Sequence, residues 1–284
     1  MAFVSRHWTS SDRLRLHARD YAPPGDEARL PVICLHGLTR NARDFDVLAP
    51  WIAARGRRVI AADVRGRGSS AHDPEARYHL PVYADDVMRM AEALGISSAV
   101  FIGTSMGGLI TMEVAAVAPD LIAATVINDV GPELGAAGLR RIGGYVGNAP
   151  RFTTWAEAAA YLAKVNAAIM PDYRIDDWDR MARRMFRAET GGIVPDYDPA
   201  IAAAFATAPT AADPWERWRG LVTGRPVLLL RGALSDLLEA EAAERMVARN
   251  DAVRLCEVPG VGHAPMLDEP AALAAIGGFL EAVR

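Results

Sequence analysis

Short apolar runs alternate with amphipathic stretches along most of this chain. Two short runs at residues 3–8 and 14–19, joined by a polar turn, predict a pair of β-strands at the start. Later apolar runs have the length of buried strands, and most are followed by a stretch with helical periodicity. Strands are predicted at residues 31–35, 58–62, 99–102, 124–128, 226–230 and 253–258. Helices are predicted at residues 45–55, 82–94, 239–249 and 271–283 and directly after Ser105.

Strands that alternate with helices pair in parallel, and their crossover helices cover both faces of the sheet. The predicted strands are nearly continuous apolar runs, as expected for strands that are covered on both faces. The pattern therefore predicts an α/β fold with a central, mostly parallel sheet.

The alternation stops between about residues 132 and 219. This segment is rich in alanine, arginine and aromatic residues, has no strong β run, and is too long and too apolar for a loop. We predict a helical lid at 132–219, lying over one end of the sheet, between two core segments at 1–131 and 220–284. Its helices are predicted at residues 139–145, 155–168, 177–188 and 199–206.

Composition and charge narrow the class of protein. The net charge is −4 and no basic run occurs, which argues against a nucleic-acid partner. No apolar stretch is long enough to span a membrane and no secretory signal is visible, so we expect a cytoplasmic protein without a membrane partner. Cys34 and Cys256 lie inside predicted strands and are interpreted as packing residues rather than as a disulfide framework.

Ser105 is the strongest candidate for chemistry. It lies in a Gly-x-Ser-x-Gly pattern at residues 103–107, where a predicted strand turns into a predicted helix. A serine hydroxyl becomes a useful nucleophile when a tight turn presents it to a base, and flanking glycines remove side chains that would clash in that turn. We therefore predict that Ser105 is a catalytic nucleophile.

His263 is the predicted base. It follows the last predicted strand and precedes the last helix, and Gly260 and Gly262 suit a tight loop there. His72 and His79 lie among acidic residues, but their spacing matches no metal-ligand pattern, so no metal is predicted. The remaining histidines fit the role of base less well; they are His7, His17 and His36.

The base needs a carboxylate to orient it, and two aspartates compete for that role. Asp236 is preferred because it follows the strand at 226–230, so that serine, aspartate and histidine occur in the order expected for this type of nucleophile turn. Asp129 is the alternative, since it directly follows the strand at 124–128 at the same edge of the sheet.

Two backbone N–H groups are predicted to form an oxyanion hole. Met106 follows the nucleophile and opens a helix, so its amide is free of helical partners. Leu38, after His36 and Gly37, is expected to provide the second donor.

The chain resembles the α/β-hydrolase superfamily along essentially its whole length. Four motifs carry the resemblance in the expected order: Leu-His-Gly-Leu at 35–38, Asp-Val-Arg-Gly-Arg-Gly-Ser-Ser at 63–70, Gly-Thr-Ser-Met-Gly-Gly at 103–108 and Gly-Val-Gly-His-Ala-Pro at 260–265. The resemblance implies an eight-stranded, mostly parallel sheet, a lid where the helical segment falls, and no cofactor. A serine nucleophile disfavours the dehalogenase and epoxide hydrolase reactions, which use an aspartate. The motif at 63–70 is expected to hold a loop rather than to contact substrate.

These observations predict a serine hydrolase that cleaves a carboxylic ester of a small to medium apolar or aromatic substrate. Hydrolysis of a lactone, an enol-lactone or a carbon–carbon bond in a ring-cleavage product is the alternative within the superfamily. A ligand-sensing protein with slow turnover is the alternative outside catalysis. The oligomeric state, monomer or homodimer, stays open. Candidate substrate-binding residues are His36, Tyr145, Trp155 and Trp178. Four arginines of the predicted lid could recognise a carboxylate or could instead be solvated: Arg140, Arg141, Arg183 and Arg184.

Overall fold

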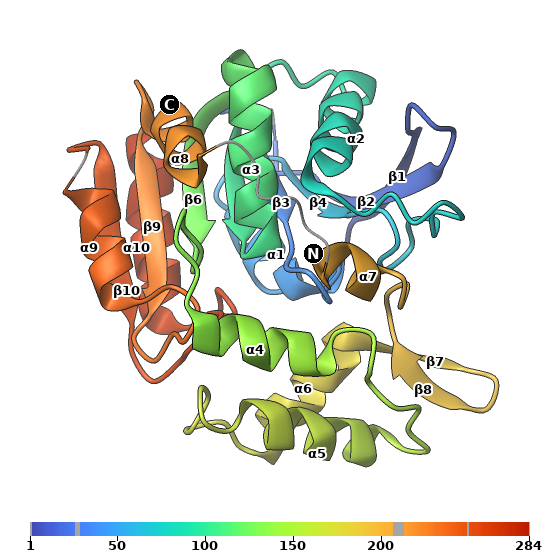
Figure 1. Ribbon diagram of the computed structural model, residues 1–284. Coiled ribbons are helices and arrows are strands. Elements are labelled where there is room, and N and C mark those ends of the chain that lie inside the picture. The colour runs from blue at the N-terminus through green and yellow to red at the C-terminus, as the bar shows by residue number, and fades with distance from the viewer. Residues whose placement is uncertain (1, 26–28, 207–212, 249, 284) are drawn as a thin grey trace.

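One eight-stranded sheet organises the protein, in the strand order β1-β2-β4-β3-β5-β6-β9-β10. The computed structural model describes residues 2–25, 29–206, 213–248 and 250–283. β1 (Val4–Thr9) pairs antiparallel with β2 (Arg15–Tyr21), and β2 pairs antiparallel with β4 (Val59–Asp63). All other neighbours in this sheet are parallel. The predicted mostly parallel sheet of eight strands is therefore confirmed (Figure 1).

The core strands and helices follow the predicted order with small shifts of their ends. The remaining strands of the sheet are β3 (Val32–Leu35), β5 (Ala99–Thr104), β6 (Ile122–Asn128), β9 (Val227–Gly232) and β10 (Val253–Val258). The core helices are α1 (Leu48–Ala53), α2 (Leu80–Ala93), α3 (Met106–Val117), α8 (Pro214–Val222), α9 (Ala240–Val247) and α10 (Pro270–Ala282). Short 3-10 turns occupy Ala42–Phe45 and Pro119–Leu121.

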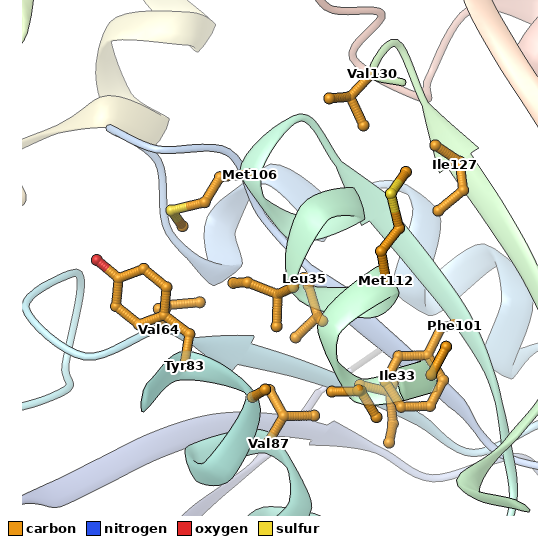
Figure 2. Packing of buried hydrophobic residues seen from close by; sticks show 14 of the residues in the cluster. Ile33, Leu35, Val64, Tyr83, Val87, Phe101, Met106, Met112, Ile127 and Val130 are labelled. Atoms are coloured by element: carbon orange, nitrogen blue, oxygen red, sulfur yellow. The ribbon is translucent and has the colours of Figure 1, made fainter. Parts of the chain in front are cut away.

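Both faces of the sheet are covered, and successive residues of a strand enter different hydrophobic clusters. In β3, Ile33 and Leu35 belong to the cluster that includes side chains of α2, α3 and α9, whereas Val32 and Cys34 belong to the cluster on the other face, with side chains of α1 and α10. Figure 2 shows the first of these clusters, in which side chains of β3 and β5 meet Val87 of α2 and Met112 of α3. This two-sided burial explains why the strands read as continuous apolar runs.

The segment between β6 and α8, which we call the insertion (residues 129–206), places α4, α5 and α6 in a separate layer below the sheet in Figure 1. It lies at the end of the sheet where β6 leads into α4. Its helices are α4 (Ala136–Tyr145), α5 (Trp155–Asn166), α6 (Ile175–Met185) and α7 (Ile201–Ala206). The part of the insertion predicted as a helix at residues 199–206 is thus α7, which begins two residues later.

The expectation that this segment lacks β structure is wrong. β7 (Phe186–Glu189) and β8 (Gly192–Pro195) pair antiparallel, so the helix predicted at 177–188 ends at Met185. Gly191 and Gly192 adopt φ values of +90° and +140°, which turn the chain between the strands. Phe186 is held in extended conformation and packs edge-on against Phe152, a contact that no local pattern reveals.

α8 was not predicted, and the expected end of the lid at residue 219 falls inside it. α8 packs against α3, and its Trp218 is completely buried. α8 therefore covers a face of the sheet rather than extending the insertion. No helix among the described residues is long and apolar enough to cross a membrane.

The loop at residues 63–70 is a structural element, as its sequence suggests. Arg65 is fully buried and its guanidinium pairs with Asp86 at 2.6 Å and Asp73 at 3.0 Å. Gly68 has a φ of +56°, and a Cβ there would lie 2.3 Å from Oδ1 of Asp63. The carboxylate of Asp63 also accepts a hydrogen bond from the Ala42 N–H, which ties this loop to the segment after β3.

Candidate active site

Ser105 stands on a sharp turn between β5 and α3. Its backbone adopts φ +52° and ψ −116°, a conformation that a non-glycine residue holds only when its surroundings impose it. The surroundings are tight: a Cβ at Gly103 would lie 2.5 Å from the carbonyl oxygen of Gly107, and one at Gly107 would lie 2.1 Å from that of Leu35. The flanking glycines therefore permit the helix to start close against β3 and β5, and the turn lifts the hydroxyl out of the sheet.

His263 bridges Ser105 and Asp129. Its Nε2 lies 2.9 Å from Oγ of Ser105, and its Nδ1 lies 2.9 Å from Oδ2 of Asp129. A carboxylate can only accept a hydrogen bond, so the proton of the neutral ring is on Nδ1 and Nε2 is free to accept from the serine hydroxyl. The structure thus brings together the predicted nucleophile, the predicted base and the alternative acid.

Asp129 is held rigidly in this position. Its side chain is fully buried and accepts hydrogen bonds from the Gly232 N–H at 2.8 Å and the Ser235 hydroxyl at 2.6 Å. The residue adopts a φ of +59° directly after β6, and its own N–H donates to the carbonyl of Leu230 in β9. Backbone and side chain are therefore both fixed by β9 and the loop after it.

The preference for Asp236 as the partner of His263 needs correction. Asp236 directs both carboxylate oxygens to Arg141 of α4, at 2.7 and 2.9 Å. Burial alone would raise the pKa of Asp236, but the Arg141 guanidinium outweighs it and holds the pKa below its ordinary value. Asp236 therefore ties the insertion to the loop after β9, and the carboxylate that hydrogen-bonds the imidazole is that of Asp129, which follows β6.

The loop after β3 lies beside the serine, and His36 sets its geometry. The Val64 N–H donates to Nε2 of His36 at 3.0 Å, so the ring proton is on Nδ1, which lies 2.8 Å from the Gly37 carbonyl oxygen. Because a trans peptide is planar, this bond directs the N–H of Leu38 away from His36. Leu38 lines the same cavity as Ser105.

His36 is consequently not a cavity residue. The structure places it completely buried behind the loop, which corrects its place among the candidate substrate-binding residues. Burial lowers the pKa of His36 to about 4, so the ring is neutral at pH 7 and keeps its donor and acceptor assignments.

A cavity between the sheet and the insertion opens onto Ser105 and His263. The core contributes the loops at 37–40 and 263–267 together with Thr104 and Ser105, and the insertion contributes α4, α5, α6 and the β7–β8 hairpin. Aliphatic side chains and side chains with hydroxyl or amide groups both line the cavity. They include Ile142, Leu162, Val165, Met181, Tyr145, Tyr161, Asn166 and Tyr197.

Of the aromatic candidates, Tyr145 lies in this cavity and the two tryptophans lie elsewhere. Trp155 packs under the guanidinium of Arg183, 4.9 Å from its ring centre. Trp178 packs against Tyr173 with ring centres 5.0 Å apart. The tryptophans are therefore packing residues of the insertion, and the prediction that they bind substrate is not met by their positions.

The candidate arginines of the insertion are mostly occupied by acidic partners. Arg141 pairs with Asp236, Arg183 with Asp179 and Arg184 with Asp268. The arginine that does line the cavity is Arg40, from the loop after β3, which the sequence did not single out. Among the described residues, no group of three or more His, Cys, Asp or Glu side chains is arranged to hold a metal ion.

Comparison with known proteins identifies the family of the chain. A model of the alpha/beta hydrolase fold family matches residues 31–270, which is most of the chain. The chain is an α/β-hydrolase. A 3-hydroxybutyrate-oligomer hydrolase of Cupriavidus necator is 38% identical to it over 272 residues, covering 91% of both chains.

Solved structures that resemble this hydrolase align with nearly its whole length. An alpha/beta hydrolase from Novosphingobium aromaticivorans is 46% identical, with a TM-score of 0.93 and complete coverage of both chains. E-2-(acetamidomethylene)succinate hydrolase is 27% identical with a TM-score of 0.82, covering 99% of this hydrolase and all of that chain. These structural alignments include the insertion, and therefore the helices and the hairpin that line the cavity.

Proposed function

We propose that this hydrolase cleaves carboxylic esters through an acyl-enzyme on Ser105. The observation that carries the proposal is the position of His263, which lies 2.9 Å from both the serine hydroxyl and the Asp129 carboxylate. This is the arrangement in which an imidazole can take the serine proton while a buried carboxylate stabilises the resulting imidazolium.

The reaction follows from these contacts. His263 takes the proton of Ser105 as the hydroxyl oxygen attacks the ester carbonyl, and the N–H groups of Leu38 and Met106 bind the oxyanion. The imidazolium then gives the proton to the departing alcohol, which leaves an acyl group on Ser105. His263 next takes a proton from water, the hydroxide attacks the acyl carbonyl, and the acid departs as the proton returns to Ser105. Asp129 keeps the imidazole in the required tautomer throughout.

Short oligomers of hydroxyalkanoic acids are the substrate class that we favour. The relative from Cupriavidus necator is named for 3-hydroxybutyrate oligomers. Such esters carry small aliphatic groups, which suit the aliphatic side chains of Ile142, Leu162 and Val165 in the cavity lining. Their repeating ester carbonyls find hydroxyl and amide groups in Tyr145, Tyr161 and Asn166, which line the same cavity.

Kinetics with Ser105→Ala test the mechanism. We expect the variant to retain less than about 0.1% of the wild-type kcat on p-nitrophenyl butyrate, and a fluorophosphonate to label the wild type but not the variant. Equal activity of the two proteins would reject the proposal. A parallel panel of lactones and diketo acids separates the ester preference from cleavage of a lactone or a carbon–carbon bond, and turnover far slower than release of a bound ligand would favour a sensor.

A further inference from the structure

Arg40 places a permanent positive charge in the wall of the cavity. Among the described residues that line this cavity, it is the one whose side chain cannot lose its charge at any ordinary pH. The side chain is only 15% exposed. A guanidinium that is withdrawn from water into a substrate cavity needs strong acceptors on each side of its planar fork.

The two edges of the Arg40 fork have unequal partners. Nε and Nη2 donate to the Asp44 carboxylate at distances from 2.7 to 2.9 Å. Nη1 and Nη2 face instead the sulfurs of Met185 and Met266, each at 3.2 Å. A thioether sulfur is a weak acceptor, whereas a carboxylate would accept both of these N–H groups in a bidentate pair.

The residues around this second edge can make room for a ligand. Met185 and Met266 both line the cavity, so the edge lies toward the space that substrate enters. Methionine side chains are unbranched and adapt readily to a changed neighbour. The second edge of Arg40 is thus covered by two adaptable thioethers rather than by a fixed strong acceptor.

Arg40 also lies close to the nucleophile. A Cβ built on Gly37 would lie 3.4 Å from Cγ of Arg40 and 3.7 Å from Cβ of Ser105, so the two side chains flank the same glycine. In the carboxyl-terminal unit of a 3-hydroxyalkanoate oligomer, the free carboxylate carbon is separated from the nearest ester carbonyl carbon by four bonds, or about 5 Å. When that carbonyl is at Ser105, the terminal carboxylate therefore stays within the same cavity, whose lining includes Arg40.

We propose that Arg40 binds the free carboxylate of the leaving hydroxy acid, so that the hydrolase removes single units from the carboxyl end of an oligomer. The inference rests on the proposed ester hydrolysis and adds to it a substrate class, oligoesters with a free carboxylate, and a direction of cleavage. In the acyl-transfer step, the released unit leaves as a hydroxy acid with its carboxylate on Arg40 and the proton from His263 on its hydroxyl. The remainder of the chain stays on Ser105 until water releases it.

The first experiment compares a 3-hydroxybutyrate trimer with its methyl ester, which has the same scissile bonds and no negative charge. We expect the wild type to show a kcat/KM at least about tenfold higher for the free acid, the ratio typical of one charge-assisted hydrogen-bonded pair. In Arg40→Gln, the value for the free acid should fall about tenfold to a hundredfold while that for the methyl ester changes less than about threefold. Arg40→Lys, which keeps the charge but loses the fork, should recover part of the loss.

Arg43→Gln is the matched control. It removes the same charge three residues away, but Arg43 pairs with Asp196 and does not line the cavity. We expect it to affect the free acid and the methyl ester equally. A trimer whose carboxyl-terminal unit carries ¹³C tests the direction of cleavage. Cleavage from the carboxyl end should release labelled monomer first.

Several results would overturn the carboxylate site while leaving the ester hydrolase intact. One is a wild type that cleaves p-nitrophenyl esters but has the same kcat/KM for the free trimer and its methyl ester. Another is an equal loss of kcat/KM for both trimers in Arg40→Gln. The third is the release of unlabelled monomer as the first product. If Arg40→Gln does not fold, the proposal is tested by the wild-type ratio of kcat/KM for the free trimer to that for its methyl ester, and by the order in which labelled and unlabelled monomer appear. Inactivity of the wild type on every ester would instead overturn the proposed function itself.

Discussion

Asp129 lies 2.9 Å from Nδ1 of His263, although 134 residues separate the two in the chain. The contact depends on the neighbouring strands β6 and β9, because Asp129 leaves the end of β6 and is fixed by the Gly232 N–H and the Ser235 hydroxyl beyond β9. His263 approaches from the loop after β10, the next strand in the sheet. The carboxyl ends of three parallel strands thus supply the acid, its supports and the base at one edge.

The two aspartates near this edge should respond differently to loss of charge. We expect Asp129→Asn to lower kcat on a p-nitrophenyl ester about 10³- to 10⁴-fold, because an amide in this position favours the wrong tautomer of His263. Asp236→Asn should lower kcat less than about tenfold, since Asp236 hydrogen-bonds Arg141 instead. Steady-state kinetics of both variants, with thermal unfolding as a check on folding, provide the measurement. A larger loss of kcat in Asp236→Asn would restore Asp236 as the acid.

The close approach of α3 to β3 should make Gly107 intolerant of any side chain. A Cβ there would lie 2.1 Å from the Leu35 carbonyl oxygen, which belongs to the backbone of the sheet and cannot rotate away. We expect Gly107→Ala to lower the free energy of unfolding by at least about 2 kcal/mol in urea titrations. Gly278→Ala in α10 is the control: a Cβ there meets nothing within 4 Å, so helix propensity should leave stability equal or raise it by up to about 1 kcal/mol. Similar effects of the two substitutions would contradict this view of the turn.

Burial of His36 should make stability depend on pH in a defined window. The pKa of His36 is lowered from 6.5 to about 4 in the folded state, so between these values the unfolded chain binds the extra proton. Stability from this group is therefore complete above pH 6.5 and is lost as the pH falls toward 4. From pH 7 to pH 5, we expect the wild type to lose about 1–2 kcal/mol more free energy of unfolding than His36→Asn, whose amide does not titrate. Parallel slopes for the two proteins would show that His36 is not held neutral.

The pair of Arg141 and Asp236 should hold the insertion against the core. Arg141 lies on α4, Asp236 follows β9, and two hydrogen bonds join them. Because a charged hydrogen bond contributes about 1.5–3 kcal/mol, we expect Arg141→Gln to increase proteolysis of the insertion about tenfold or more. Arg180→Gln is the control, since Arg180 is exposed and pairs with Asp177 three residues earlier on the same helix, α6. Equal rates of cleavage in the two variants would argue against an anchoring role.

The local sequence pattern was sufficient to predict most strands and helices of the core, because each has its own hydrophobic periodicity. The strands β3, β4, β5, β6, β9 and β10 lie within a few residues of their predicted ranges, since burial on both faces leaves a continuous apolar run in the sequence. Ser105 and His263 were found in the same way, because glycines mark the turns on which they lie. The β7–β8 hairpin was missed because its four-residue strands have mixed composition, and its pairing is visible only in the fold.

The choice between Asp129 and Asp236 could not be made from the sequence. Both follow strands that end at the same edge of the sheet, so local pattern treats them alike. Their roles are separated by contacts between distant segments: Ser235 and Gly232 fix Asp129, and Arg141 of α4 occupies Asp236. Likewise, Arg40 is one arginine among many in the sequence, and only the packing of the insertion places it in the wall of the cavity. The sequence by itself determined which elements form and where the serine and histidine stand, because those depend on neighbours along the chain; the tertiary structure decided which charged groups meet them, because that depends on neighbours in space.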